Sequence, residues 1–334
     1  MTLERSILAA NFLSRTGWGT AVRTDLAGDA SMRRYERLHT SSGETAILMD
    51  APPETNADIR PFITIARHLT NIGLSAPQIY SEDPASGFLL LEDLGDDLFA
   101  RIIPDAPKME QPLYETATDV LIALHQSGTP SLTHFGPELM AQQASLVFDT
   151  WVQTIADTND TDASDIFRAR FQDLLHQTTQ SDPVMILRDY HAENLIWLPE
   201  RSGVARVGLL DFQDAMLAHP AYDLVSLLQD VRRDVPATIE QAMIARYIAL
   251  SGQDDHSFRT AYAVLGVQRN LRILAVFARL ASRLGKPFYA TLIPRTWAHL
   301  MRGLGHPALA PIAAMLIETL PRPTASNLQK MVLA

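Results

Sequence analysis

Polar residues that follow three apolar segments in the middle of the chain constrain its fold more than any other feature. The strand-like run Val184–Leu187 leads into a polar loop that contains Asp189, and the sequence turns apolar again after Asn194. A third apolar run, Ala205–Leu210, ends directly before Asp211. We expect strand ends to present these two carboxylates and the amide, which are hard oxygen ligands that suit Mg²⁺.

The same residues suit the separate parts of a phosphoryl-transfer reaction. An Asp followed five residues later by an Asn is the spacing of the catalytic loop in protein kinases. Asp189 is predicted to accept the proton of a substrate hydroxyl, and Asn194 with Asp211 to hold a Mg²⁺ that bridges phosphate oxygens. His191 is predicted to hydrogen-bond the backbone near Asp211 and fix the loop. Taken singly, each residue is also explained as a polar cap on a strand end, but their joint spacing favours catalysis.

The hydrophobic periodicity of the first 90 or so residues differs from that of the rest of the chain. The first 90 or so residues predict a small antiparallel sheet with helices at Leu3–Thr16 and Ile59–Asn71. The predicted strands are Ala21–Leu26, Arg33–Leu38, Thr45–Asp50, Gln78–Ser81 and Phe88–Glu92. After residue 95 the periodicity is mainly helical. The sequence therefore predicts an α+β fold with an N-terminal nucleotide-binding lobe at residues 1–94 and a larger, mainly helical C-terminal lobe at residues 95–334.

The composition is that of a folded, acidic protein. Of the 334 residues 47% are hydrophobic, the formal net charge is −10, and cysteine is absent, which excludes disulfides. The acidic balance and the lack of a basic stripe argue against a nucleic-acid partner. No apolar run approaches the length that spans a bilayer, and the N-terminal segment lacks a signal-peptide pattern. We expect a cytoplasmic location, no membrane association and no obligate protein partner.

The segments Leu187–Asn194 and Leu210–Asp214 resemble the two hallmark motifs of the aminoglycoside phosphotransferase family, also called choline-kinase-like or protein-kinase-like. The resemblance covers nearly the whole chain. It implies a bilobal protein-kinase-like fold, ATP and Mg²⁺ as cofactors, and a small-molecule alcohol as acceptor. The segments Gly28–Tyr35, Met49–Pro53 and Val267–Leu274 resemble, more narrowly, the anomeric N-acetylmuramate/N-acetylglucosamine kinases of bacterial cell-wall recycling. Those kinases phosphorylate the anomeric hydroxyl, but a shared fold does not by itself fix the acceptor.

The family resemblance also implies residues around the nucleotide. Gly28 and Ser31 lie in the segment that is similar to the hairpin over the phosphates. Glu92 and Leu94 lie in the segment that is similar to the hinge strand, which meets adenine through its backbone. Asp223 matches an Asp of the family that braces the catalytic loop from a helix N-terminus. An ordinary helix N-cap explains an Asp at this position as well, and the two roles are compatible.

Lysine is missing where a kinase of this kind normally has one. The only lysines are Lys108, Lys286 and Lys330, so no third-strand lysine can contact the ATP phosphates. Phosphoryl transfer still needs a countercharge. We predict that either Arg33 or Arg34 provides it, because neighbouring strand residues face opposite sides of a sheet. Both arginines could instead simply face solvent.

The acceptor site is the least determined part of the sequence. We assign Asp214, Arg269 and Arg272 to the acceptor site. Arg269 and Arg272 lie on one predicted helix, and an arginine there could pair with the carboxylate of a sugar acid. A solvated helix face explains the two arginines equally well. Kinases of aminoglycosides or amino alcohols, and a nucleotide-binding scaffold without turnover, remain as alternatives. The acceptor and the choice between ATP and GTP are not fixed by the sequence.

Overall fold

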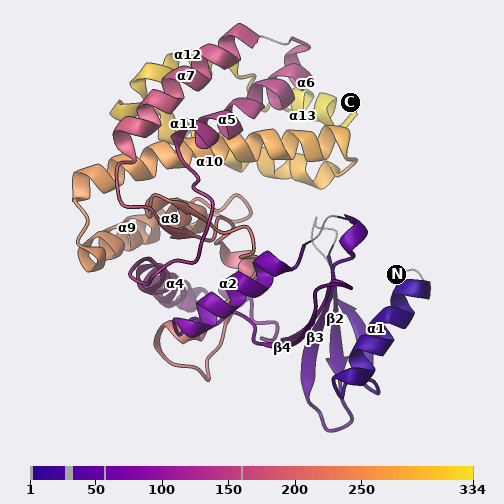
Figure 1. Ribbon diagram of the computed structural model, residues 1–334. Helices are drawn as coiled ribbons and strands as arrows, with labels where there is room; N and C mark the ends of the chain where they lie inside the picture. The colour runs from indigo at the N-terminus through magenta and orange to yellow at the C-terminus, as the bar shows by residue number, and fades with distance from the viewer. Residues whose placement is uncertain (1–2, 27–32, 56–57, 159–160, 334) are drawn as a thin grey trace. The chain divides into compact units, whose positions relative to one another are not determined.

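The computed structural model describes residues 3–26, 33–55, 58–158 and 161–333. By their contacts these residues form two compact units (Figure 1). Unit 1 contains residues 1–130 and 193–215, and unit 2 contains residues 131–192 and 216–334. These units differ in their bounds from the two predicted lobes, 1–94 and 95–334, and the lobe boundary after residue 94 stays a prediction.

Unit 1 is built on a five-stranded antiparallel sheet with strand order β1-β2-β3-β5-β4. The strands are β1 Val22–Leu26, β2 Arg34–His39, β3 Thr45–Asp50, β4 Ile79–Asp83 and β5 Phe88–Glu92. Helix α1 (Leu3–Arg15) lies along one face of this sheet (Figure 1). Ala9, Phe12 and Leu13 of α1 form a buried core with alternate residues of β2, β3 and β5. This alternation fixes which strand residues lie against the helix and which lie on the opposite face.

The rest of unit 1 is a small ladder and three further α-helices. The helices are α2 Arg60–Asn71, α3 Phe99–Asp105 and α4 Glu110–His125. Strands β7 (Leu195–Trp197) and β8 (Val207–Leu209) pair with each other. The ring of Phe62 in α2 packs against Phe212 with 4.8 Å between centroids. The residue after Asp211 is thereby anchored to a helix of the same unit.

Unit 2 is mainly helical and is organised around α10 (Asp255–Arg283), which packs against α5, α8 and α11. Gly303 of α11 has no side chain where α10 passes, and an added Cβ would lie 2.7 Å from a methyl group of Val267. A two-stranded ladder joins β6 (Val184–Ile186) to β9 (Met216–Ala218). The remaining helices are α5 Pro137–Val147, α6 Gln153–Ala156, α7 Thr161–Thr178, α8 Ala221–Leu228, α9 Ala237–Ser251, α11 Ile293–Leu304, α12 Ala310–Thr319 and α13 Ala325–Leu333.

The predicted α+β fold class is confirmed, with an antiparallel sheet followed by a mainly helical region. All five strands predicted before residue 95 are present with ends within two residues of the expected ones. Within the mainly helical region, a π-helical turn at Phe148–Val152 separates α5 from α6. Four of the five side chains in that turn are buried. Buried side chains therefore point to several sides of this turn, whereas an amphipathic helix buries only one face.

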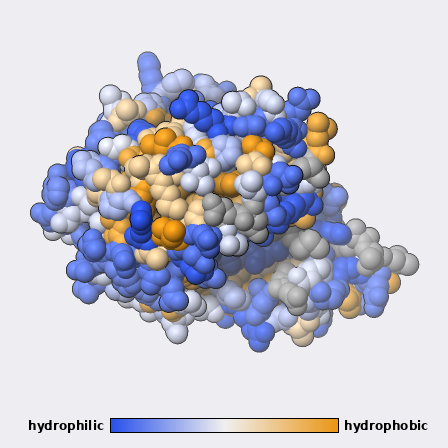
Figure 2. Space-filling model, turned by 90° about the horizontal axis from the view of Figure 1, so that it is seen from above, coloured by the Kyte–Doolittle hydropathy of each residue, from blue (hydrophilic) through white to orange (hydrophobic). Residues whose placement is uncertain are grey.

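The surface and the lengths of the apolar helices were compared with what a membrane-spanning chain requires. On the face shown in Figure 2, hydrophobic side chains are interspersed among hydrophilic ones. In the described part of the chain no single helix is long and apolar enough to cross a membrane, although Pro287–Leu304 and Pro307–Thr319 meet that criterion together across a bend of 93°.

Candidate active site

Helix α8 of unit 2 holds the backbone directly before Asp189. The buried carboxylate of Asp223, in the first turn of α8, accepts the N–H of Leu187 at 2.5 Å and that of Arg188 at 2.9 Å. Ser226 of the same helix donates its hydroxyl to the Arg188 carbonyl at 3.0 Å. The brace predicted for Asp223 is therefore present.

The held backbone has an unusual conformation. Arg188 has φ = +70°, in the left-handed region that residues with a Cβ seldom adopt. The bonds from Asp223 and Ser226 keep it there, since such a conformation persists only when its surroundings hold it. The backbone that leads into Asp189 is thus fixed, and it sets the direction in which the half-buried Asp189 side chain leaves the loop.

Buried charges surround this loop in unit 2. Burial raises the pKa of Asp223 to about 7; the hydrogen bonds from Leu187 and Arg188 oppose the rise, the charge of Asp189 adds to it, and Arg269 lowers it. Arg269 lies on α10, is almost fully buried and is electrostatically coupled to Asp189. Burial lowers its pKa. Unit 2 therefore brings together three predicted or implied site residues: Asp189, Asp223 and Arg269.

His191 is a buried side chain whose surroundings favour the neutral imidazole. It is buried, and its Nε2 lies 3.2 Å from Nη1 of Arg232. Burial, followed by the charges of Arg232 and Arg269, lowers the pKa of His191 well below its ordinary value. A guanidinium only donates, so Nε2 must accept and the proton must sit on Nδ1. The predicted bond from His191 to the backbone near Asp211 stays a prediction.

Asn194 and Asp211 lie at neighbouring strand ends in unit 1. Leu210 donates its N–H to the Asn194 carbonyl at 3.0 Å, and Leu195 pairs with Leu209. Asp211 is exposed, has φ = +55° and accepts a hydrogen bond from Gln213 at 2.7 Å. The structure thus brings the two predicted metal ligands together.

The donor set at this point fits a nucleotide-bound Mg²⁺ better than a protein-enclosed ion. One carboxylate and one amide are too few for an octahedral shell, so phosphate oxygens and water would supply the rest. In the described residues no group of three or more His, Asp and Glu side chains could hold a metal by itself. Asn194 and Asp211 are therefore suited to Mg²⁺ that arrives with a phosphate ligand.

Of the other residues predicted to bind the nucleotide, the structure describes only some. Gly28 and Ser31 lie outside the described residues. The Glu92 carboxylate pairs with Arg201 and accepts the N–H of Gln78 at 3.2 Å. Leu94 is largely buried, with its methyl group near Gly208. Their contact with adenine stays a prediction.

The acceptor residues differ in exposure. Arg269 is almost fully buried, Arg272 is half-buried one helical turn later, and Asp214 is exposed in unit 1. Sequence reasoning missed Arg232, whose contact with His191 spans 41 residues. Nothing in its sequence surroundings separates it from an ordinary surface arginine. The placement of all three acceptor residues against a substrate stays a prediction.

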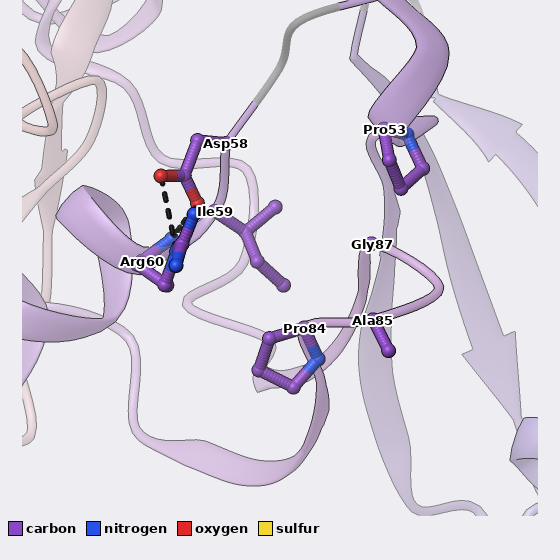
Figure 3. Close-up of a pocket in the computed structure, with 7 residues that line it drawn as sticks. All are labelled: Pro53, Asp58, Ile59, Arg60, Pro84, Ala85 and Gly87. Carbon is purple, nitrogen blue, oxygen red and sulfur yellow. Dashed lines mark hydrogen bonds and ion pairs between the residues drawn. The ribbon is translucent and has the colours of Figure 1, made fainter.

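Unit 1 also contains a cavity of about 490 Å³ (Figure 3). It is lined by the loop that follows β3 and by the turn between β4 and β5, with Pro53, Asp58, Ile59, Arg60, Pro84, Ala85 and Gly87. Asp58 and Arg60 bind each other at 2.9 Å across its wall. None of the residues predicted for nucleotide, metal or acceptor lines it.

The chain belongs to the phosphotransferase enzyme family, whose model matches residues 22–262. This confirms the predicted enzyme class. An N-acetylmuramate/N-acetylglucosamine kinase of Caulobacter vibrioides is 41% identical, over 96% of this chain and 99% of the relative.

Solved structures show the same fold at low identity. A choline kinase from Streptococcus pneumoniae superposes with a TM-score of 0.63 at 14% identity, over 90% of this chain and 100% of that one. An ADP-bound aminoglycoside phosphotransferase gives a TM-score of 0.61 at 11% identity, over 94% of this chain and 99% of the other. These similarities confirm the predicted choline-kinase-like fold.

Proposed function

We propose that the protein is an ATP- and Mg²⁺-dependent kinase that phosphorylates the anomeric hydroxyl of N-acetylmuramic acid or N-acetylglucosamine. The observation that carries the proposal is the 41% identity, along nearly the whole chain, to a kinase named for these two sugars. The local geometry supports it, because the loop before Asp189 is held by three hydrogen bonds from α8.

The chemistry assigned to the chain is a single phosphoryl transfer. Asp189 accepts the proton of the anomeric hydroxyl while a bond forms between that oxygen and the γ-phosphorus. The bond from the γ-phosphorus to the β,γ-bridging oxygen breaks, and ADP leaves. Asn194 and Asp211 would hold Mg²⁺, which when bound would offset negative charge on the phosphate oxygens. The product is a sugar 1-phosphate.

The charges around the catalytic loop in unit 2 favour a neutral or anionic acceptor. Arg269 is coupled to both Asp189 and Arg272, and Arg232 contacts His191. In the described part of unit 2 none of these three arginines forms an ion pair within 4 Å. A polycationic aminoglycoside needs carboxylates at such a place, whereas the carboxylate of N-acetylmuramic acid suits arginines. We assign Arg272 and Arg232, which are half-buried, to that carboxylate.

A transfer assay with Mg-ATP and a panel of acceptors tests the proposal. N-acetylmuramic acid or N-acetylglucosamine should be consumed, with loss of reducing-sugar reactivity because the anomeric oxygen becomes esterified. Chelation of the metal should abolish turnover. Consumption of a kanamycin-like compound alone would refute the acceptor assignment, and ATP binding without any transfer would indicate a scaffold. The cytoplasmic location stays a prediction.

A further inference from the structure

The segment from Glu92 to Asp96, here called the hinge segment, contains three acidic residues, and each of them is bound to an arginine of unit 1. Asp93 and Asp96 both pair with Arg37 of β2, and Glu92 pairs with Arg201. The family resemblance implies that the backbone of this segment meets adenine. Its acidic side chains serve protein contacts, so their role in nucleotide binding has to be sought in what those contacts do to the backbone.

Strand register brings Arg37 to the hinge segment. Arg37 lies opposite Ile47, and Ile47 lies opposite Leu91, so these residues form one row across β2, β3 and β5. Opposed residues project to the same face, and this row lies on the face away from α1, because the alternate residue Leu38 packs with α1. Asp93 is two residues beyond Leu91 and continues along the same side. The pairing of the sheet therefore places Arg37 beside the end of β5.

The contact between Arg37 and Asp93 is made through two nitrogens and is largely enclosed. Nη2 of Arg37 donates to Oδ1 of Asp93 at 3.1 Å, and Nε lies 2.8 Å from Oδ2. The exposed fractions of the two side chains are 18% and 7%. Asp96 also accepts from Arg37, at 2.6 and 3.0 Å, but its side chain is 58% exposed. Because solvent weakens an exposed ion pair, Asp93 is the more important partner.

The carboxylate of Asp93 also shapes the turn within the hinge segment. Its Oδ1 accepts the N–H of Gly95 at 3.0 Å. Gly95 has φ = +84°, a left-handed conformation that glycine adopts without strain. An aspartate that binds the N–H two residues further on closes a tight turn. Arg37 holds this carboxylate and thereby fixes the backbone from Asp93 to Gly95.

The hinge segment is attached on its other side to the β7–β8 ladder. Arg201, in the connection between β7 and β8, binds the first residue of the segment. Directly after the segment, the Asp97 carbonyl accepts the N–H of Trp197 of β7 at 2.7 Å. Strand β7 begins directly after Asn194, and Asp211 lies two residues after the end of β8. The hinge segment and the two predicted Mg²⁺ ligands therefore belong to one hydrogen-bonded assembly within unit 1.

We propose that Arg37 is a positioning residue for the nucleotide: together with Arg201 on the other side, it holds the hinge segment in the conformation that binds adenine, at a fixed place relative to the predicted metal ligands. The inference rests on the proposed ATP-dependent function. A backbone that is already ordered loses little entropy when adenine binds, so the affinity is higher. The cation at the phosphate end, Arg33 or Arg34, stays a separate prediction.

Titration calorimetry of the full chain with adenosine, and separately with Mg-ATP, tests this proposal without relying on turnover. Arg37→Met keeps the apolar stem and removes the charge, so binding of both ligands should weaken about fivefold, since the hinge segment must then be ordered on binding. Arg37→Lys retains a single donor group and should recover part of the loss. Asp93→Asn should weaken binding more than Asp96→Asn does, because Asp93 is the less exposed partner.

Arg23→Met is the matched control. Arg23 forms a comparable contact with Glu36 of β2, at 2.5 and 3.0 Å, directly beside Arg37 in the strand but without any part in the hinge segment. Its affinity for both ligands should remain that of wild type. In Arg37→Met the KM for ATP should rise while kcat at saturating ATP stays unchanged, because the catalytic loop is untouched.

The outcomes separate the role of Arg37 from the proposed function. Normal adenosine affinity in Arg37→Met, a loss confined to Mg-ATP, or a wild type that binds Mg-ATP but not adenosine would overturn the role at the adenine end. An equal loss in Arg23→Met would overturn it too, since the cause would be general loosening of the sheet. If Arg37→Met does not fold, Asp93→Asn compared with Asp96→Asn decides. A wild-type protein that binds neither ligand would instead refute the proposed function itself.

Discussion

The carboxylate of Asp223 accepts the backbone N–H of Arg188 at 2.9 Å, although Arg188 is held at φ = +70°. The same carboxylate accepts the N–H of Leu187. One buried side chain from α8 thus fixes the two peptide groups that precede Asp189. A residue 35 positions away along the chain sets the direction of the predicted base.

Replacement of Asp223 by Ala is expected to lower both stability and turnover. Two charge-assisted hydrogen bonds are lost in a buried place, so the free energy of unfolding should fall by about 2–4 kcal/mol. Turnover should fall about a hundredfold with the affinity for Mg-ATP retained, because Asp189 loses its fixed direction. Thermal unfolding, steady-state kinetics and nucleotide titration measure these effects.

Asp254→Ala is the matched control for that experiment. Asp254 caps α10 and accepts the N–H of Ser257 at 2.9 Å, so it also serves a helix through a backbone bond. Its loss should lower the free energy of unfolding less than that of Asp223 does and leave turnover unchanged. An Asp223→Ala protein with normal turnover would contradict the role of Asp223 in positioning the loop.

Asp189→Asn is expected to stop catalysis while preserving the nucleotide site. The amide keeps the shape of the side chain but cannot accept the hydroxyl proton, so turnover should fall by about two to four decades. Binding of Mg-ATP should stay within a few-fold of wild type. A variant that turns over at near-normal rate would show that Asp189 is not the base.

The placement of the predicted catalytic and metal residues at strand ends was readable from sequence because it depends on local features. Asp189 and Asn194 are five residues apart, and Asp211 directly follows an apolar strand, so strand ends and spacing suffice. The surroundings of Arg34 were not readable from sequence. They depend on Arg34 lying opposite Asp50 and on Asp50 binding Arg5, which are contacts between distant segments.

Other features were missed for the same physical reason. Strand β9 has only three residues, too few for a periodic pattern, and it exists because β6 pairs with it. Arg232 resembles a solvated arginine until the fold brings it to His191. Residues whose role comes from tertiary contacts leave no local signal.

Arg272→Ala is expected to change the preference between the two proposed acceptors. N-acetylmuramic acid carries a carboxylate and N-acetylglucosamine does not, so only the former should lose an ionic contact. Its KM should rise about tenfold, while kcat and the KM for N-acetylglucosamine stay nearly constant. Arg279→Ala, an exposed arginine on the same helix, serves as control. Equal effects on both sugars would remove Arg272 from the carboxylate site.

His219 is expected to make folding stability depend on pH between about 4 and 6.5. It is buried at the end of the β9–α8 connection, and its Nδ1 accepts the N–H of Ala221 at 3.1 Å. Burial lowers the pKa of His219 to about 4, whereas the unfolded chain titrates near 6.5. Below pH 6.5 the unfolded state therefore binds a proton that the folded state refuses, and stability falls as the pH falls, by at most about 3 kcal/mol at pH 4.

The contribution of His219 has to be measured as a difference between variants. Asp223 acts in the opposite direction, because its raised pKa of about 7 makes the folded state bind a proton more tightly than the unfolded state does. His219→Asn keeps an acceptor for the Ala221 N–H and removes the titration. Urea unfolding from pH 7.5 down to pH 4.5 should show wild type losing stability relative to His219→Asn, while His256→Asn, at an exposed position, should follow wild type. A constant difference between wild type and His219→Asn over this range would mean that His219 titrates alike in the folded and unfolded states.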